Sequence, residues 1–191
     1  MLSGTVFPVM DPAIPRSTTT HGPLLPVWRP LRVADLGTVM TLADRLHPAC
    51  PERMDVLAER HRLCPEGCLI MPDAQGTAGG YLLSHPWRMG TPPALDTYLG
   101  HLPERPDCWY LHDIALLPAL RGRGATQAAL QIMTRLACAR GIRWLALVAT
   151  EGAGPVWTHL GFAPMPGISP AITATYGADA CPMRRRIDQA A

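Results

Sequence analysis

The sequence of 191 residues contains no lysine and no asparagine, and all 17 residues counted as Lys or Arg are arginine. Without lysine, the chain cannot hold a substrate or pyridoxal phosphate as a Schiff base, form a Ser–Lys catalytic pair or build a Walker A phosphate loop. Without asparagine, it has no acceptor for N-glycosylation. The bias against both residues, together with 21 prolines, is typical of a GC-rich genome.

Long hydrophobic runs are also absent, because no 18 consecutive apolar residues occur and no transmembrane helix is expected. Residues 1–26 lack a basic segment followed by an apolar one and are interrupted by five prolines. We therefore expect no signal peptide, a flexible N-terminal arm over 1–26, and a cytoplasmic protein. A formal net charge of +2 gives no reason to expect binding to nucleic acid or to a membrane.

The six cysteines form no CxxC pair, which removes the commonest signature of a zinc or redox site. Without a secretory signal, we expect reduced thiols. His61, Cys64 and Cys68 lie close together in sequence, but their spacing fits no standard structural zinc site. The sequence therefore predicts no metal.

What is present describes one globular domain over residues 27–191, with 48% apolar and 17% charged residues in the chain. Hydrophobic periodicity and turn residues predict a mixed α/β fold. The first half is expected to hold a strand, two helices and a two-stranded hairpin, at residues 27–33, 34–46, 51–63, 67–71 and 77–84. A long proline-rich connection follows at 85–107, with a possible helical turn at 95–102; connections of this length are often functional.

The second half is expected to alternate strands with helices, at residues 109–117, 125–140, 143–150, 154–160 and 182–187. The stretch 109–150 then forms a β-α-β crossover. The three consecutive arginines Arg184, Arg185 and Arg186 are interpreted as the solvated face of an edge strand.

A turn of glycine and arginine, Arg121-Gly122-Arg123-Gly124, leads from a strand directly into a helix. The first N–H groups of a helix lack intrahelical partners, the helix dipole adds positive potential, and glycine lets a phosphate approach the backbone. The turn therefore predicts a phosphate-binding site. Its spacing matches neither the Walker A loop nor the GxGxxG fingerprint.

Residues 114–124, Ile-Ala-Leu-Leu-Pro-Ala-Leu-Arg-Gly-Arg-Gly, resemble motif A of the GNAT superfamily of acetyl-CoA-dependent N-acetyltransferases. Residues 157–162, Trp-Thr-His-Leu-Gly-Phe, resemble the closing Tyr-x-x-x-Gly-Phe motif of that superfamily. The resemblance covers residues 28–187. It implies a GNAT fold, with a central mixed and mostly antiparallel sheet flanked by about four helices, and acetyl-CoA as co-substrate.

A finer resemblance is to the arylalkylamine (serotonin) N-acetyltransferase branch. Residues 111–116, Leu-His-Asp-Ile-Ala-Leu, are similar to its Leu-His-x-Leu-Ala-Val strand, and the pairs Cys50-Pro51 and Cys64-Pro65 are spaced as in that branch. There the first Cys-Pro pair lies in a mobile loop over the amine pocket. On this resemblance Pro51 would line the substrate site.

The sequence departs from the family pattern at several site positions. Thr126 stands where glycine or alanine is usual, and Thr150 replaces a common asparagine. Trp157 occupies the place of the tyrosine that protonates the leaving thiolate, and its indole is not a usable acid. Tyr110 replaces a second histidine, and Tyr176 is the nearest candidate for an aromatic residue that contacts the substrate.

The resemblance implies that acetyl-CoA, the acetyl donor, binds at three places. These are the backbone N–H groups of the strand, the turn with the start of the following helix, and two positions later in the chain. These residues are Ile114, Ala115, Leu116, Arg121, Gly122, Arg123, Gly124, Ala125, Thr126, Gln127, Thr150 and Trp157. His112 is the best catalytic base, acting through water, because imidazole titrates near neutrality, and Tyr110 would orient that water. Tyr110 and His112 share one face of the strand, and Asp113 faces the other way unless a bulge intervenes.

The function predicted from these features is transfer of an acetyl group to the primary amine of a small molecule, an arylalkylamine or polyamine-like compound. The amine would attack directly in a ternary complex, and a ping-pong route through a cysteine is disfavoured. Two alternatives stay open: acetylation of a protein N-terminus or lysine, and a non-catalytic acyl-CoA sensor. We expect a monomer or a homodimer.

Overall fold

The computed structural model describes residues 27–73, 76–150 and 152–187 of the chain. The predicted arm at 1–26 and the middle of the predicted hairpin turn, Ala74 and Gln75, lie outside the described residues. No described helix combines the length and the apolar character that crossing a membrane requires.

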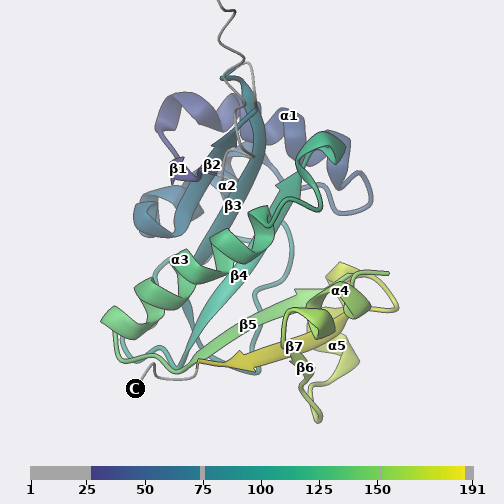
Figure 1. Ribbon diagram of the computed structural model, residues 1–191. Helices are drawn as coiled ribbons and strands as arrows, with labels where there is room; N and C mark the ends of the chain where they lie inside the picture. The colour runs from purple at the N-terminus through teal and green to yellow at the C-terminus, as the bar shows by residue number, and fades with distance from the viewer. Residues whose placement is uncertain (1–26, 74–75, 151, 188–191) are drawn as a thin grey trace, which may run out of the picture.

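One seven-stranded sheet, in the order β1-β2-β3-β4-β5-β7-β6, organises the fold (Figure 1). All neighbouring strands are antiparallel except β4 and β5, which are parallel. This confirms the predicted mixed, mostly antiparallel sheet and the β-α-β crossover. The strands are β1 (Arg29–Pro30), β2 (Cys68–Pro72), β3 (Ala78–Trp87), β4 (Cys108–Leu116), β5 (Trp144–Ala149), β6 (Ala163–Pro164) and β7 (Cys181–Arg186).

Helices cover both faces of this sheet. Figure 1 shows α3 lying across β3 and β4, where alternate apolar residues of the strands pack against it. The other face of β2 and β3 packs against α1 and α2 in a second apolar cluster. The described α-helices are α1 (Leu36–Leu46), α2 (Met54–Leu63), α3 (Ala125–Ala139), α4 (Gly154–His159) and α5 (Pro170–Thr173).

Several boundaries differ from those predicted. β1 occupies only two residues of the expected strand at 27–33, and β6 and α5 were not predicted, since such short elements carry no periodicity. The helix predicted from Pro51 begins at Met54, because Arg53 has an extended backbone (ψ 148°). No helical turn forms at 95–102.

The segment before α2 is held instead by polar contacts with the long connection. The Arg53 backbone N–H and its guanidinium donate to the Asp96 carboxylate at 2.8 and 3.1 Å, and the Asp96 N–H donates to Glu52 at 2.8 Å. The late start of α2 therefore leaves Glu52 outside the helix, in a segment without regular structure, and its side chain is buried.

A β-bulge interrupts the pairing of β3 with β4. Leu83 lies opposite Asp113 and Ser84 lies opposite Leu111, so His112 is the extra residue on β4. A bulge of this kind changes the alternation of side chains along the strand. As a result Asp113 does not face away from Tyr110 and His112: it contacts residues on their side of the sheet.

The parallel strands β4 and β5 pair only over Trp109↔Leu145 and Tyr110↔Ala146. Figure 1 shows the two strands meeting at one end and spreading apart toward their carboxyl ends. Beyond Tyr110, the edge of β4 that faces β5 therefore has no neighbouring strand within the described part of the chain. Its backbone N–H and C=O groups need other partners.

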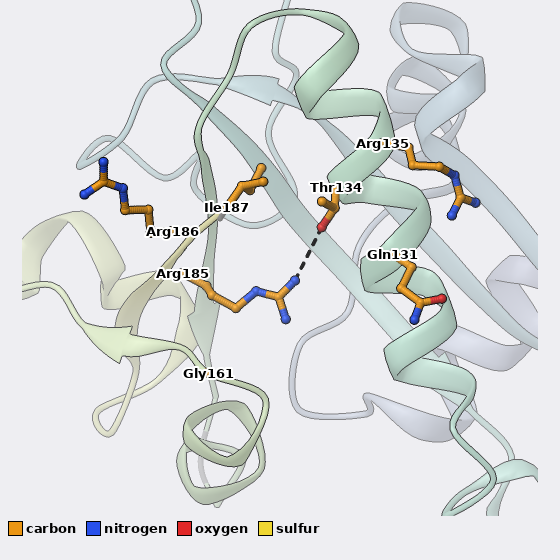
Figure 2. A pocket seen from close by; sticks show the side chains of 7 residues that line it. All are labelled: Gln131, Thr134, Arg135, Gly161, Arg185, Arg186 and Ile187. Carbon is orange, nitrogen blue, oxygen red and sulfur yellow. Dashed lines mark hydrogen bonds between the residues drawn. The ribbon is translucent and has the colours of Figure 1, made fainter. Parts of the chain in front are cut away.

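The predicted edge-strand arginines do not lie on an edge strand, because β7 pairs with both β5 and β6. Arg185 and Arg186 line a groove of about 670 Å³ between α3 and β7. Figure 2 shows Arg135 and Arg186 pointing away from each other there. Arg185 alone spans the groove, donating to Thr134 Oγ1 (3.4 Å) and to the Leu160 carbonyl (3.0 Å). Its guanidinium also lies 5.3 Å from the Phe162 ring centroid. The arginines of the groove do not converge on a common ligand. We therefore interpret the groove as a packing interface, in which Arg185 connects β7 with α3 and with the end of α4.

Replacing Arg185 with methionine should test whether its contacts stabilise the fold. The methionine keeps much of the apolar stem but loses the hydrogen bonds and the cation–π contact, so we expect the free energy of unfolding to fall by about 1–3 kcal/mol. Urea denaturation measures the change. Arg186→Met, at an exposed position on the same strand, is the matched control and should change stability by no more than about 0.5 kcal/mol. Equal effects of both changes would show that Arg185 does not join the elements.

Candidate active site

A cleft of about 620 Å³ opens where β4 ends and α3 begins. One wall is the end of β4 and the following turn, a second is the first turn of α3, and a third is α4. Its lining residues are Leu46, His47, Ile114, Ala115, Leu116, Leu120, Arg121, Gly122, Gly124, Ala125, Thr126, Gln127, Ala153, Val156, Trp157, His159 and Leu160. Residues predicted from sequence as the donor site thus lie together in one cavity.

The turn at the start of α3 presents backbone donors to this cleft. Gly122 (φ 70°) and Gly124 (φ 77°) both have the left-handed backbone that glycine adopts without strain. Gly124 is the N-cap residue of α3, and no side chain caps the helix there. The first N–H groups of α3 are therefore available to an anion. Arg121 is held in place because its Nε donates to the Leu116 carbonyl at 3.0 Å.

A second, smaller cavity of about 140 Å³ adjoins the cleft between the spreading ends of β4 and β5. The two cavities share four lining residues, His47, Ile114, Ala153 and Trp157, so they form one continuous space. The smaller cavity is further lined by Cys50, Glu52, Leu95, Leu111, His112, Asp113, Val148, Thr150 and Tyr176.

A buried ion pair stands at the wall of the smaller cavity. His112 Nε2 lies 2.7 Å from Glu52 Oε1, and the side chains of both residues are almost completely buried. The Arg60 guanidinium, which has no exposed surface, lies behind Glu52 with its Nη2 3.7 Å from Glu52 Oε2. Arg60 also donates to the Thr97 carbonyl at 3.1 Å. The three side chains therefore form a connected line from the interior to the cavity.

Glu52 is ionised at neutral pH. Burial disfavours the carboxylate, but the adjacent His112 imidazole and the charge of Arg60 outweigh this effect and lower the pKa of Glu52 to about 2. A permanent carboxylate at Nε2 favours a proton on that nitrogen. It therefore leaves the other ring nitrogen, Nδ1, with its lone pair free.

Nδ1 of His112 is buried and has no hydrogen-bond partner within the described residues. A buried polar atom without a partner is unusual in a folded protein and calls for an explanation. Because His112 lines the smaller cavity, a ligand or water in that cavity can supply the missing partner. The arrangement resembles a catalytic pair in which a carboxylate orients an imidazole base.

Tyrosine and histidine side chains surround this pair without titrating near neutral pH. Tyr110 is buried below the cavity, and its hydroxyl lies 3.1 Å from that of Tyr176. Tyr176 donates to the Pro93 carbonyl at 2.6 Å, and burial raises the pKa of Tyr176 to about 12. His85 has its ring centroid 6.4 Å from that of His112, and burial together with that neighbour lowers the pKa of His85 to about 3. Tyr176 and His85 therefore do not change their protonation near neutral pH.

Three of the predicted residues line neither cavity. Pro51 is exposed and lines neither cavity, although its neighbours Cys50 and Glu52 line the smaller one. Arg123 is exposed and is absent from the lining of the cleft. Tyr110 is buried and lines neither cavity, but its ring centroid lies 6.4 Å from that of His112 and its hydroxyl lies beside that of Tyr176. The other predicted residues all line a cavity, and Trp157 lines both.

Glu52 and Asp113 are the acidic residues that sequence reasoning missed. Nothing in the local pattern separates Glu52 from the exposed acidic residues that often begin a helix. Asp113 was considered and placed on the opposite face, because a bulge leaves no reliable mark in a single sequence. No cluster of three or more His, Cys, Asp or Glu side chains suited to a metal occurs among the described residues.

Comparison with known proteins agrees with this geometry. A sequence model described as the Acetyltransferase (GNAT) family matches residues 38–162. A comparison with curated protein sequences found no match.

Solved structures share the fold at low sequence identity. One is the GphF GNAT-like decarboxylase in complex with isobutyryl-CoA, with a TM-score of 0.68 and 16% identity over 85% of this chain and 100% of that one. A second is the ribosomal-protein-S18-alanine N-acetyltransferase from Escherichia coli, with a TM-score of 0.59 and 18% identity over 86% of this chain and 96% of that one. A third is a GNAT superfamily phosphinothricin acetyltransferase from Sinorhizobium meliloti in complex with acetyl-CoA, with a TM-score of 0.58 and 19% identity over 87% of this chain and 90% of that one.

Replacing Glu52 with glutamine should reveal the buried ion pair in the pH dependence of stability. Since the pKa of Glu52 in the folded protein lies below its ordinary value of 4.5, its contribution is complete above pH 4.5 and is lost as the pH falls toward about 2. At pH 7 we expect Glu52→Gln to cost about 3–5 kcal/mol, because Arg60 is left buried without a counter-charge.

Urea denaturation between pH 3 and pH 7 measures both effects. The variant should lose less stability on acidification than the parent protein does. Glu66→Gln is the control, because the Glu66–Arg140 pair is well exposed and should contribute no more than about 1 kcal/mol. Parallel pH profiles for the parent protein and Glu52→Gln would contradict the assignment of an ionised, buried Glu52.

Proposed function

Because this chain belongs to the GNAT family of acetyltransferases, we propose that it transfers the acetyl group of acetyl-CoA to the primary amine of a small molecule. The amine attacks directly while both substrates are bound. The observation that carries this proposal is the unpartnered Nδ1 of His112, a residue that lines the small cavity adjoining the larger cleft.

The larger cleft fits coenzyme A in its shape and in its donors. The uncapped first turn of α3 and the two left-handed glycines suit the pyrophosphate, with Arg121 adding positive charge. The free edge of β4 at residues 114–116 offers backbone groups that can pair with the extended pantetheine arm, as another strand would. The co-substrate supplies an acetyl thioester, which reaches the small cavity from this edge.

The residues of the small cavity provide the base for this reaction. An amine is an ammonium ion at neutral pH and must lose a proton before it can attack. His112 accepts that proton at Nδ1, directly or through one water, and the Glu52 carboxylate stabilises the resulting imidazolium. Backbone N–H groups of β4 near Ile114 polarise the thioester carbonyl. His112 then returns its proton to solvent.

Neither Trp157 nor Tyr176, which both line the smaller cavity, is a good acid for the leaving thiolate. Trp157, at the position of the family tyrosine, carries only an indole N–H. The Tyr176 hydroxyl is committed to the Pro93 carbonyl, and its pKa is about 12. The thiol of coenzyme A resembles a cysteine thiol, which is much more acidic than an alcohol. The thiolate therefore leaves first and takes its proton from water or from the attacking nitrogen.

Two features favour a small-molecule amine over the alternatives. The acceptor cavity of about 140 Å³ is bounded by the loops before α2 and around Leu95 and holds only a small group. The buried Glu52–His112 pair favours an enzyme over a passive acyl-CoA sensor, because an oriented base has no role in binding alone. Acetylation of a protein N-terminus is the second candidate, because one of the structural neighbours is such an enzyme.

Replacing His112 with alanine should remove the base. We expect kcat/KM for the amine to fall by about 10²–10⁴ at pH 7, because general-base catalysis contributes this much, while the Kd of acetyl-CoA stays unchanged. Release of the coenzyme A thiol over a panel of amines measures the rate, and calorimetry measures Kd. His101→Ala, at an exposed position, is the control. Unchanged turnover in His112→Ala would rule out this role, and binding of acetyl-CoA without turnover of any amine would favour the sensor.

Replacing Gly124 with alanine should weaken the donor site alone. An alanine at φ 77° is strained by about 1–2 kcal/mol, so we expect the turn to shift and the Kd of acetyl-CoA to rise about tenfold. Gly37→Ala is the matched control: Gly37 lies in α1, and nothing lies within 4 Å of the added methyl group. If acetyl-CoA binds equally well to both variants, its phosphates do not lie on the turn.

A further inference from the structure

The acceptor cavity holds a second carboxylate, on Asp113, that the proposed reaction does not use. Resting on the proposed function, we propose that Asp113 binds an ammonium group of the acceptor, so that the acceptor is a short aliphatic diamine. One amine of the diamine reacts at His112 while the other, still charged, is held by Asp113.

The bulge at His112 is what places Asp113 in this cavity. Both residues line it, although they are consecutive on β4. The Asp113 side chain keeps about a fifth of its surface accessible (21%), whereas that of Glu52 is nearly closed off (6%). Asp113 is therefore the carboxylate that a ligand in the cavity can reach.

The protein itself only partly satisfies the Asp113 carboxylate. The Tyr81 hydroxyl donates to Oδ2. His47 Nε2 lies 3.2 Å from Oδ1, at the distance of an ion pair but without hydrogen-bond geometry. A carboxylate has about four acceptor positions in total. Oδ1 consequently retains room for a donor, and an ammonium group is a donor with three N–H bonds.

The charges around the cavity favour a cation over an anion. Its described lining includes two carboxylates, on Glu52 and Asp113, and no arginine. The positive charge of Arg60 lies behind Glu52 and offsets that carboxylate, whereas Asp113 faces the His47 imidazole at 3.2 Å and keeps part of its surface accessible. An amino acid would bring its own carboxylate next to Asp113, at a cost that grows in a partly enclosed site.

His112 supports this as a binding site independently of the acidic residues. It is more than nine-tenths buried, lines the same cavity, and its Nδ1 has no partner within the described residues. The cavity thus offers two distinct positions, one for a neutral amine at Nδ1 and one for an ammonium at Asp113. Monoamines satisfy only the first of them.

The size of the cavity limits the length of the acceptor. At about 140 Å³ it holds roughly five non-hydrogen atoms, since one water takes up about 30 Å³ in the liquid. A short aliphatic diamine is of this size. An indole ring with its side chain is too large to enter completely, so between the arylalkylamine and polyamine-like acceptors expected from sequence the cavity favours the second.

The test compares diamines of three to six carbons with monoamines of equal length and with amino acids, in the parent protein and in Asp113→Asn. We expect the parent protein to show a KM for the best diamine about 10–100-fold below that for the matched monoamine, as one charge-assisted hydrogen bond allows. Asp113→Asn should raise the diamine KM by the same factor and leave the monoamine KM and the Kd of acetyl-CoA unchanged. Asparagine keeps an oxygen for the Tyr81 hydroxyl, and thermal unfolding checks that the variant is folded.

Two further variants separate direct binding from other effects. Asp44→Asn removes a negative charge from an exposed position on α1, outside the cavity lining, and should leave the diamine KM unchanged. His47→Gln removes the ion-pair partner of Asp113 and should lower the diamine KM. If His47→Gln instead raises it as much as Asp113→Asn does, Asp113 only positions the loop that carries His47, and the proposal is wrong.

Failure of the inference and failure of the proposed function give different results. Turnover by the parent protein with equal KM values for diamines and monoamines, or a diamine KM unaffected by Asp113→Asn, would overturn the inference alone. Absence of thiol release with every amine would overturn the proposed function. In that case calorimetric titration of a diamine into the protein with bound coenzyme A still tests Asp113: the proposal requires binding at least tenfold weaker in Asp113→Asn, and equal binding would overturn it.

Discussion

The short parallel pairing of β4 with β5 decides where this protein can bind other molecules. The strands share two residue pairs and then separate, so the edge of β4 after Tyr110 lies open. Backbone donors and acceptors at an open edge must find partners in water or in a ligand. Both cavities lie along this edge, and the start of α3 adds its free N–H groups at one end. Donor and acceptor can therefore meet in one continuous space.

The second constraint is the burial of the Arg60, Glu52 and His112 side chains beside the two adjoining cavities. Arg60 and Glu52 would each be costly to bury alone, and together with His112 they form a connected line whose outer end is an imidazole nitrogen. The late start of α2 and the contacts of Asp96 hold Glu52 in place. A buried ion pair is a weak source of stability, and here it fixes the tautomer and orientation of His112.

The sequence was most informative where function depends on the backbone. The glycine turn and the strong periodicity of 125–140 predicted the turn and α3, because left-handed turns demand glycine and helices have a regular period. Phosphate binding at this turn stays a prediction. The order of strands and helices followed from the same signals. The family is confirmed by the sequence comparison, whereas the finer likeness to the serotonin N-acetyltransferase branch stays a prediction.

The acidic residues of the acceptor cavity could not be predicted from the sequence. Whether Asp113 faces His112 depends on a bulge, and whether Glu52 turns inward depends on the irregular segment before α2. Neither feature leaves a clear signature in one sequence. Local chemistry thus predicted the proposed donor site, since its groups belong to one turn and one helix. Only the tertiary structure decided which residues line the proposed acceptor site, because its charges come from segments that meet across the sheet and are oriented by burial.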